Sequence, residues 1–153
     1  MLRLAIISHA LVQEDLQKRW RRFADKFNVE VFLLVPRVWH TSWFRETFSY
    51  RTQRATEGNF SIIPLPTTSR KTWRHYFFFS LDVKLRLLQP DVLYVIHEEQ
   101  IWIHQQVITC RNLWAPKTKL LFFSMNALGA KQDTFLQRVC LRRIRNNYQA
   151  ALC

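Results

Sequence analysis

Glycine is scarce in this sequence, with only two in 153 residues. A glycine-rich loop lets a backbone approach a nucleotide pyrophosphate closely, and side chains at the same positions prevent that approach. The stretch after the first apolar run, residues 8–15, reads SHALVQED and contains no glycine. A dinucleotide-dependent oxidoreductase is therefore disfavoured, and we expect no cofactor.

Cysteine is also sparse, and long apolar runs are missing. The three cysteines, Cys110, Cys140 and Cys153, form no CxxC pair, and no His/Cys cluster has the spacing of a zinc site. An odd cysteine number without a secretory signal indicates a reducing, cytoplasmic location. No apolar run approaches the roughly 20 residues that span a bilayer. We therefore predict no metal site and no spanning segment.

Positive charge is what the sequence has in excess, with 23 Lys and Arg against 11 Asp and Glu, a net charge of +12. That field favours anionic partners: nucleic acid, an acidic membrane surface or phosphorylated metabolites. Basic sets lie at 18–22, 70–75 and 138–147, and the simplest interpretation is solvated helix faces. Without an RNP-like strand or a zinc finger, nucleic acid is not expected. Peripheral contact with an anionic inner membrane face stays possible, because each nearby basic residue contributes about 1 kcal/mol.

Short apolar runs alternate with amphipathic segments along the chain, which predicts an α/β fold. The predicted strands span residues 3–8, 29–35, 60–66, 91–96 and 119–124, and the predicted helices span 14–27, 72–89, 98–114 and 133–151. Strands that are apolar on both faces, between helices, indicate a mostly parallel sheet with helices on both faces. Right-handed crossovers make this a doubly wound, Rossmann-like domain.

Three details of this prediction depend on single residues. Strand 60–66 is expected at a sheet edge, because Pro64 and Pro66 cannot donate to a ladder. Residues 36 to about 60 show no sustained period and are expected to form a long loop. The apolar stripe of helix 14–27 is Leu16, Trp20, Phe23 and Phe27, and that of helix 72–89 is Phe78, Leu81, Leu85 and Leu88.

The aromatic side chains of the predicted loop have two open interpretations. They are Trp39, His40, Trp43, Phe44, Phe48 and Tyr50. They could stack on a sugar or dip into a membrane interface. They could equally pack down as a small core over the edge of the sheet.

Candidate site residues follow the strands, because ligands of open parallel sheets bind outside the carboxyl ends of the strands. They are His9 after the first strand, His97 and Glu98 after the fourth, and Ser124 and Asn126 after the fifth. Histidine beside carboxylates suits contact with a polyol or proton transfer. The carboxylates could instead open the following helix, whose dipole favours negative charge. No nucleophile arrangement is present by spacing, so no catalytic residue is assigned.

Five segments together resemble a known family. They are MLRLAIISHALVQEDLQKRWRRFAD, VEVFLLVP, PDVLYVIHEEQ, KLLFFSMNAL and LRRIRNNYQAALC. The chain resembles the N-terminal half of the family 4 glycosyltransferases, GT-B enzymes with two Rossmann-like domains facing across a cleft. Two departures stand out. Many members have a glycine-rich loop at the position of Ser8-His9-Ala10, and many have a histidine near Ser124-Met125-Asn126.

The resemblance implies a role for the chain and for its residues. The N-terminal domain of the family binds the acceptor, and a C-terminal domain, absent here, binds the nucleotide-sugar donor. His97 and Glu98 would contact the acceptor, and His9, Ser124 and Asn126 would line the cleft. The whole enzyme would be a hexosyltransferase-like protein that transfers a sugar to a glycan or lipid-linked acceptor.

The resemblance also implies how the chain is organised. Residues 1–153 would be one domain truncated in its sixth strand, which begins at AALC, and this fragment alone would be inactive. The alternative is a stand-alone basic α/β module that binds nucleic acid or an anionic membrane surface.

Overall fold

The computed structural model describes residues 1–43, 46–69, 76–97, 101–123 and 135–152. One seven-stranded sheet has the order β5-β6-β2-β1-β7-β8-β9. Its strands are β1 (Arg3–Ile7), β2 (Glu30–Pro36), β5 (Ala55–Glu57), β6 (Phe60–Leu65), β7 (Val92–Ile96), β8 (Lys119–Phe123) and β9 (Ala150–Leu152). In this sheet only β5 runs antiparallel to its neighbour. The predicted Rossmann-like α/β architecture with a mostly parallel sheet is confirmed.

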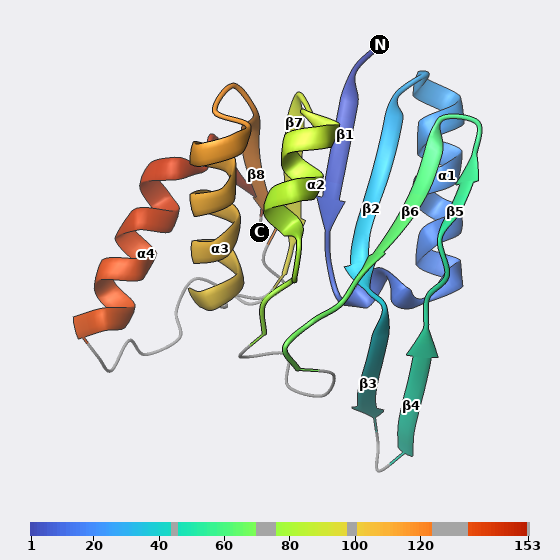
Figure 1. The fold of residues 1–153 in the computed structure, drawn as a ribbon, viewed down its shortest axis with the longest axis horizontal. Coiled ribbons are helices and arrows are strands. Elements are labelled where there is room, and N and C mark those ends of the chain that lie inside the picture. Colours follow the sequence, from blue (N-terminus) through green and yellow to red (C-terminus); the bar gives the residue numbers. More distant parts are fainter. Residues whose placement is uncertain (44–45, 70–75, 98–100, 124–134, 153) are drawn as a thin grey trace.

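The order of the strands reverses direction beside β1. From β1 the chain proceeds to β2 and β6 on one side, then returns to build β7, β8 and β9 on the other. The helices are η1 (Ala10–Val12, a 3-10 turn), α1 (Glu14–Phe27), α2 (Leu81–Leu88), α3 (Ile101–Trp114) and α4 (Phe135–Asn147). Figure 1 shows α1 behind the sheet and α2 and α3 in front of it, so helices cover both faces.

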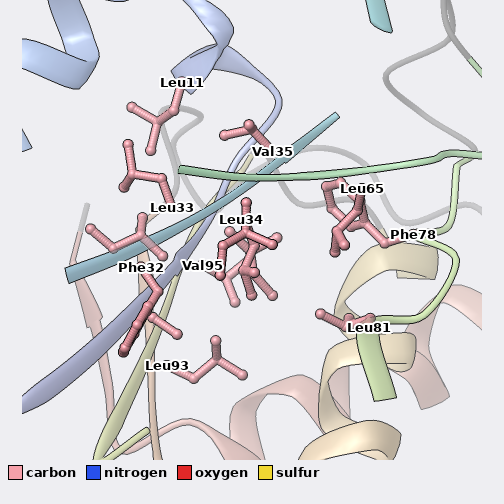
Figure 2. Close-up of a cluster of buried hydrophobic side chains, with 14 of the residues drawn as sticks. Leu11, Phe32, Leu33, Leu34, Val35, Leu65, Phe78, Leu81, Leu93 and Val95 are labelled. Carbon is pink, nitrogen blue, oxygen red and sulfur yellow. The ribbon is translucent and has the colours of Figure 1, made fainter. Parts of the chain in front are cut away.

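The core lies on the two faces of the central strands. Ile6, Leu33, Leu34 and Leu93 are fully buried, which explains the continuous apolar runs of β1, β2 and β7. Figure 2 shows Leu34, Leu93 and Val95 in the same cluster as Leu65, Phe78 and Leu81. Burying each such side chain contributes about 1.5–3 kcal/mol, so this cluster supplies the main stabilisation of the sheet.

Helix α1 forms where it was predicted, and Leu16, Trp20 and Phe23 of the predicted stripe pack against the core, but its most buried residues are others. Ala24 is fully buried and Gln17 nearly so, whereas Phe27 is 56% exposed. Gln17 is satisfied because its side-chain amide donates to the Leu11 carbonyl at 2.8 Å. The small side chain of Ala24 lets the helix approach the sheet, and the half-buried Trp20 covers the flank, 6.1 Å from the Tyr94 ring.

Helix α2 is shorter than predicted, since it begins at Leu81. Residues 70–75 lie outside the described part of the chain. Phe78 forms an antiparallel bridge with Thr67, and Ser80 has a φ of 62°, in the left-handed region that a right-handed helix cannot contain. Residues 76–80 therefore lie outside the helix, and Phe78 is paired with Thr67. Leu81 and Leu85, on the predicted stripe, are fully buried.

The predicted loop over residues 36–60 is wrong, because much of it forms strands. An antiparallel pair, β3 (Val38–Trp43) and β4 (Glu46–Arg51), projects beyond the sheet at the end where β1 finishes (Figure 1). The segment is rich in threonine and aromatic residues, which favour strands. Strand β5 then pairs with β6.

The edge position predicted for residues 60–66 is half wrong. Strand β6 pairs with β2 along its whole length, and β5 covers its other side from Phe60 to Ile62. The uncovered edge begins at Ile63, and it contains Pro64. Proline thus lies only where the strand has lost its outer neighbour, as its missing N–H requires.

The end of the chain contains the predicted sixth strand. Helix α4 ends at Asn147, earlier than predicted, and β9 pairs in parallel with β8. Whether that strand continues past Cys153 stays a prediction.

Candidate functional site

His9 and His97 meet at the point where the strand order reverses. One residue, Ser8, separates His9 from the end of β1, and His97 directly follows β7. These two strands are neighbours in the sheet. The distance from His9 Nδ1 to His97 Nε2 is 3.0 Å, and the ring centroids lie 4.6 Å apart. The two histidines therefore lie at the reversal of strand order, beside which parallel α/β sheets bind ligands.

The backbone around each histidine fixes its place. The fully buried Ser8 accepts a hydrogen bond from the Ala10 N–H through Oγ at 3.1 Å, which turns the chain into η1. On the other side, the His97 N–H donates to the Phe123 carbonyl at 3.2 Å. This bond extends the pairing of β7 with β8 by one residue, so the His97 side chain leaves the sheet at its carboxyl edge.

Two aromatic residues complete a cluster of four rings. Tyr76 Oη lies 2.9 Å from His97 Nε2, and the Trp39 ring lies 5.0 Å from that of His9 and 5.1 Å from that of Tyr76. We refer to His9, Trp39, Tyr76 and His97 as the histidine–aromatic cluster. Trp39, Tyr76 and His97 are at most 3% exposed, whereas His9 is partly exposed. His9 is therefore the member that solvent or a ligand can reach.

Burial keeps His9 and Tyr76 uncharged. It lowers the pKa of His9 to about 4 and raises the pKa of Tyr76 far above its ordinary value, because charged forms lose their hydration. His97 Nε2 offers either one lone pair or one proton, so Tyr76 and His9 share it. A neutral imidazole can donate and accept hydrogen bonds or take up a proton, but it does not attract anions.

A side-chain amide holds the segment that carries Tyr76. Gln106 of α3 donates to the Phe78 carbonyl at 2.6 Å and accepts from the Phe78 N–H at 3.0 Å. The amide thus satisfies both backbone groups as a neighbouring strand would. This clasp fixes an extended segment against α3, two residues after Tyr76.

A second buried histidine lies nearby but belongs to the core. His104 of α3 is fully buried, and its Nδ1 lies 2.8 Å from Tyr148 Oη. The ring packs edge-on against Phe122, with centroids 4.5 Å apart. The centroid of the His104 ring lies 6.4 Å from that of His97, so His104 lies next to the cluster.

The predicted site residues divide into two groups. His9 and His97 are brought together by neighbouring strands. Glu98, Ser124 and Asn126 lie outside the described residues, so their predicted roles stay predictions.

Sequence reasoning missed Tyr76 and Trp39. Tyr76 was assigned to a helix and Trp39 to a loop, and neither is close in sequence to a histidine of the cluster. The burial of Trp39 agrees with the interpretation that the aromatic residues of 36–60 pack over the sheet edge. No local pattern identifies Tyr76, which contacts His97 across 21 positions.

Metal and thiol chemistry find no support in the described residues. Within these ranges, no group of three or more His, Cys, Asp or Glu side chains could hold a metal ion. Burial, aided by Asp82, raises the pKa of the Cys110 thiol to about 11, so it stays protonated. None of the described helices is long and apolar enough to cross a membrane.

Comparisons with known proteins identify no family for this chain. No protein-family model matches the sequence, and no curated protein matches it significantly.

Proposed function

We propose that the chain is the acceptor-binding, N-terminal half of a GT-B glycosyltransferase of the family 4 type. In this proposal it is one doubly wound domain, and the whole enzyme transfers a sugar from a nucleotide-sugar donor to a glycan or lipid-linked acceptor. The observation that carries the proposal is the contact between His9 and His97 at the reversal of strand order. Ligands of this fold class bind at that point.

The neutrality of His9 decides which substrate the cluster suits. Its Nδ1 is engaged with His97, so Nε2 remains as one donor or acceptor for an uncharged sugar hydroxyl. A nucleotide diphosphate needs positive charge or glycine-rich backbone, and a neutral His9 provides neither. The resemblance implies acceptor contact for His97, but His97 is only 3% exposed. We therefore propose His9 as the contact residue for the acceptor and His97 as a positioning residue that orients His9.

Ligand titration observed by NMR tests this proposal. The chain is titrated with a panel of neutral glycans and short-chain lipid-linked sugars while the histidine ring signals are recorded. We expect an acceptor to shift the His9 signals and leave those of His40, on β3, unchanged. His9→Ala should abolish binding of a neutral acceptor, and a nucleotide sugar should leave the His9 signals unshifted.

Two results would overturn the proposal. One is binding of a nucleotide sugar at His9, or its turnover by this chain alone. The other is a panel in which no compound perturbs His9.

A second candidate, contact with an anionic membrane surface, is favoured by the outer face of α2 and α3. These helices lie side by side (Figure 1) and expose Leu87 by 68% and Leu113 by 67%, with Trp102 at 40%. Arg86 lies among them, with its guanidinium 5.5 Å from the Trp114 ring centroid. Apolar and basic side chains on one face suit a lipid interface.

Vesicle co-sedimentation tests this candidate. The double variant Trp102→Ala/Leu113→Ala should bind phosphatidylglycerol vesicles more weakly than the unchanged chain. Phe27→Ala, which removes an exposed ring on the opposite face, should bind normally. Equal binding by all three proteins, or no binding, excludes the candidate.

A further inference from the structure

A second groove lies beside the uncovered half of β6 and is surrounded by positive charge. Its volume is about 400 Å³. Arg37, Arg54 and Lys84 stand around it, and Pro64, Pro66 and Val83 contribute apolar surface. It is separate from the histidine–aromatic cluster, none of whose four residues lines it.

The fold brings the three cations together from distant positions. Arg37 directly follows β2, Arg54 directly precedes β5, and Lys84 lies in the first half of α2. The groove exists because β5 pairs with β6 only as far as Ile62. Beyond that point the prolines offer no N–H, so the open edge is a poor template for a further strand.

Within the part of the chain that the structure describes, the charges around this groove have no protein counter-ion. Among the described residues, the ion pairs use Arg3, Lys18 and Arg21, and no carboxylate lines the groove. Arg37 and Arg54 are exposed, and Lys84 is half-buried. Three cations around one hollow repel one another until an anion enters it, and they then share that anion.

A neighbouring groove differs from the groove beside β6 in the charges that line it. It has a similar volume of about 410 Å³ and lies where β4 ends, beside α1. Arg51 is its cation, and Glu14 lines the same groove. Charge is therefore balanced there and unbalanced beside β6.

We propose that the groove beside β6 binds the phosphate or diphosphate group of a phosphate ester. The planar guanidinium groups of Arg37 and Arg54 match phosphate oxygens in pairs, and Lys84 adds a point charge. The apolar surface of Pro66 and Val83 contacts the body of the ester. This inference goes beyond glycosyl transfer and does not depend on it. A soluble ester and an anionic lipid headgroup share the required chemistry.

Calorimetric titration with inorganic pyrophosphate tests the inference. Arg37→Ala, Arg54→Ala and Lys84→Ala should each weaken binding about five- to tenfold, as expected for losing one charge-assisted contact at a partly exposed site. The matched control is Arg51→Ala, which removes the same charge from the balanced groove. It should change affinity less than about twofold, because it alters only the screened general field.

Two further ligands identify the source of the phosphate. Glucose 1-phosphate represents soluble esters, and phosphatidylglycerol vesicles represent headgroups. Binding of either one supports the groove if Arg37→Ala and Arg54→Ala weaken it and Arg51→Ala does not. The inference fails if pyrophosphate, glucose 1-phosphate and the vesicles all leave the chain unbound. It also fails if Arg51→Ala is as damaging as Arg37→Ala.

One variant separates this inference from the proposed function. His9→Ala should abolish binding of a neutral acceptor and leave pyrophosphate binding unchanged. If His9→Ala still binds the neutral acceptor, only the glycosyltransferase proposal is contradicted. If the unchanged chain binds the acceptor but not pyrophosphate, only the groove is contradicted.

Discussion

His9 is a mostly buried histidine whose surroundings favour the uncharged imidazole. Its ring is packed against Trp39 and His97, and its pKa of about 4 keeps it neutral at physiological pH. At this scale the function depends on desolvation, because hydration that would stabilise the imidazolium has been removed.

Stability should therefore depend on pH through His9. Burial lowers its pKa from 6.5 to about 4, so the unfolded chain takes up a proton in this window that the folded chain does not. Stability from this group is full above pH 6.5 and falls as the pH drops towards 4. Urea unfolding should show a loss of about 2 kcal/mol between pH 7 and pH 5. His9→Gln should flatten that dependence, and an unchanged slope would contradict the assignment.

The Tyr76 hydroxyl should also contribute measurably. Tyr76→Phe removes the hydroxyl, whose one described hydrogen-bond partner is His97. We expect the free energy of unfolding, measured with urea, to fall by about 1 kcal/mol. Tyr94→Phe is the control, because its half-buried hydroxyl bonds to no described residue. Equal effects of the two variants would show that the Tyr76–His97 bond has no net stabilising role.

At the scale of elements, the extended segment before α2 is held by a side chain from α3. Gln106 takes the place of a neighbouring strand for Phe78, and Tyr76 is positioned by the same segment. Together with the bridge between Phe78 and Thr67, this contact across 28 positions holds the segment in place.

Gln106→Glu tests this clasp. The carboxylate can still accept from the Phe78 N–H but cannot donate to its carbonyl, so we expect a loss of about 2 kcal/mol at pH 7. Protonation restores a donor, so part of the stability should return below about pH 5, as measured by urea unfolding. Gln105→Glu is the control, because it also loses one donor bond, to the Cys140 carbonyl at 3.2 Å, while Arg143, which donates to Gln105 Oε1 at 2.8 Å, would pair with the new carboxylate. A similar loss in that variant would argue against a specific role for Gln106.

For the whole molecule, the dominant property is its net charge of +12. The described ion pairs are mostly solvent-exposed and contribute little, whereas repulsion among unpaired cations opposes the compact state. Raising the NaCl concentration from about 10 to 150 mM should increase the melting temperature by about 3 °C. Scanning calorimetry measures this, and a decrease would mean that the ion pairs outweigh the repulsion.

The secondary structure could be predicted from the sequence where a residue pattern has a single physical cause. Strands β1 and β2 are buried on both faces, and β7 and β8 bury alternate residues, so all four form apolar runs that can be read directly. His9 and His97 were predictable as neighbours once these strands were placed side by side. Reasoning failed for β3, β4 and the start of α2, where aromatic residues fit helix, loop and strand equally well.

The sequence by itself determined the α/β order of the core and the excess of positive charge, because both follow from residue types and local periodicity. Tertiary structure decided which side chains meet. It placed Tyr76 and Trp39 against the histidines, ended β5 early enough to open the groove beside β6, and gathered Arg37, Arg54 and Lys84 around it. These contacts join residues far apart in the chain, and only the packing of strands and helices sets such distances.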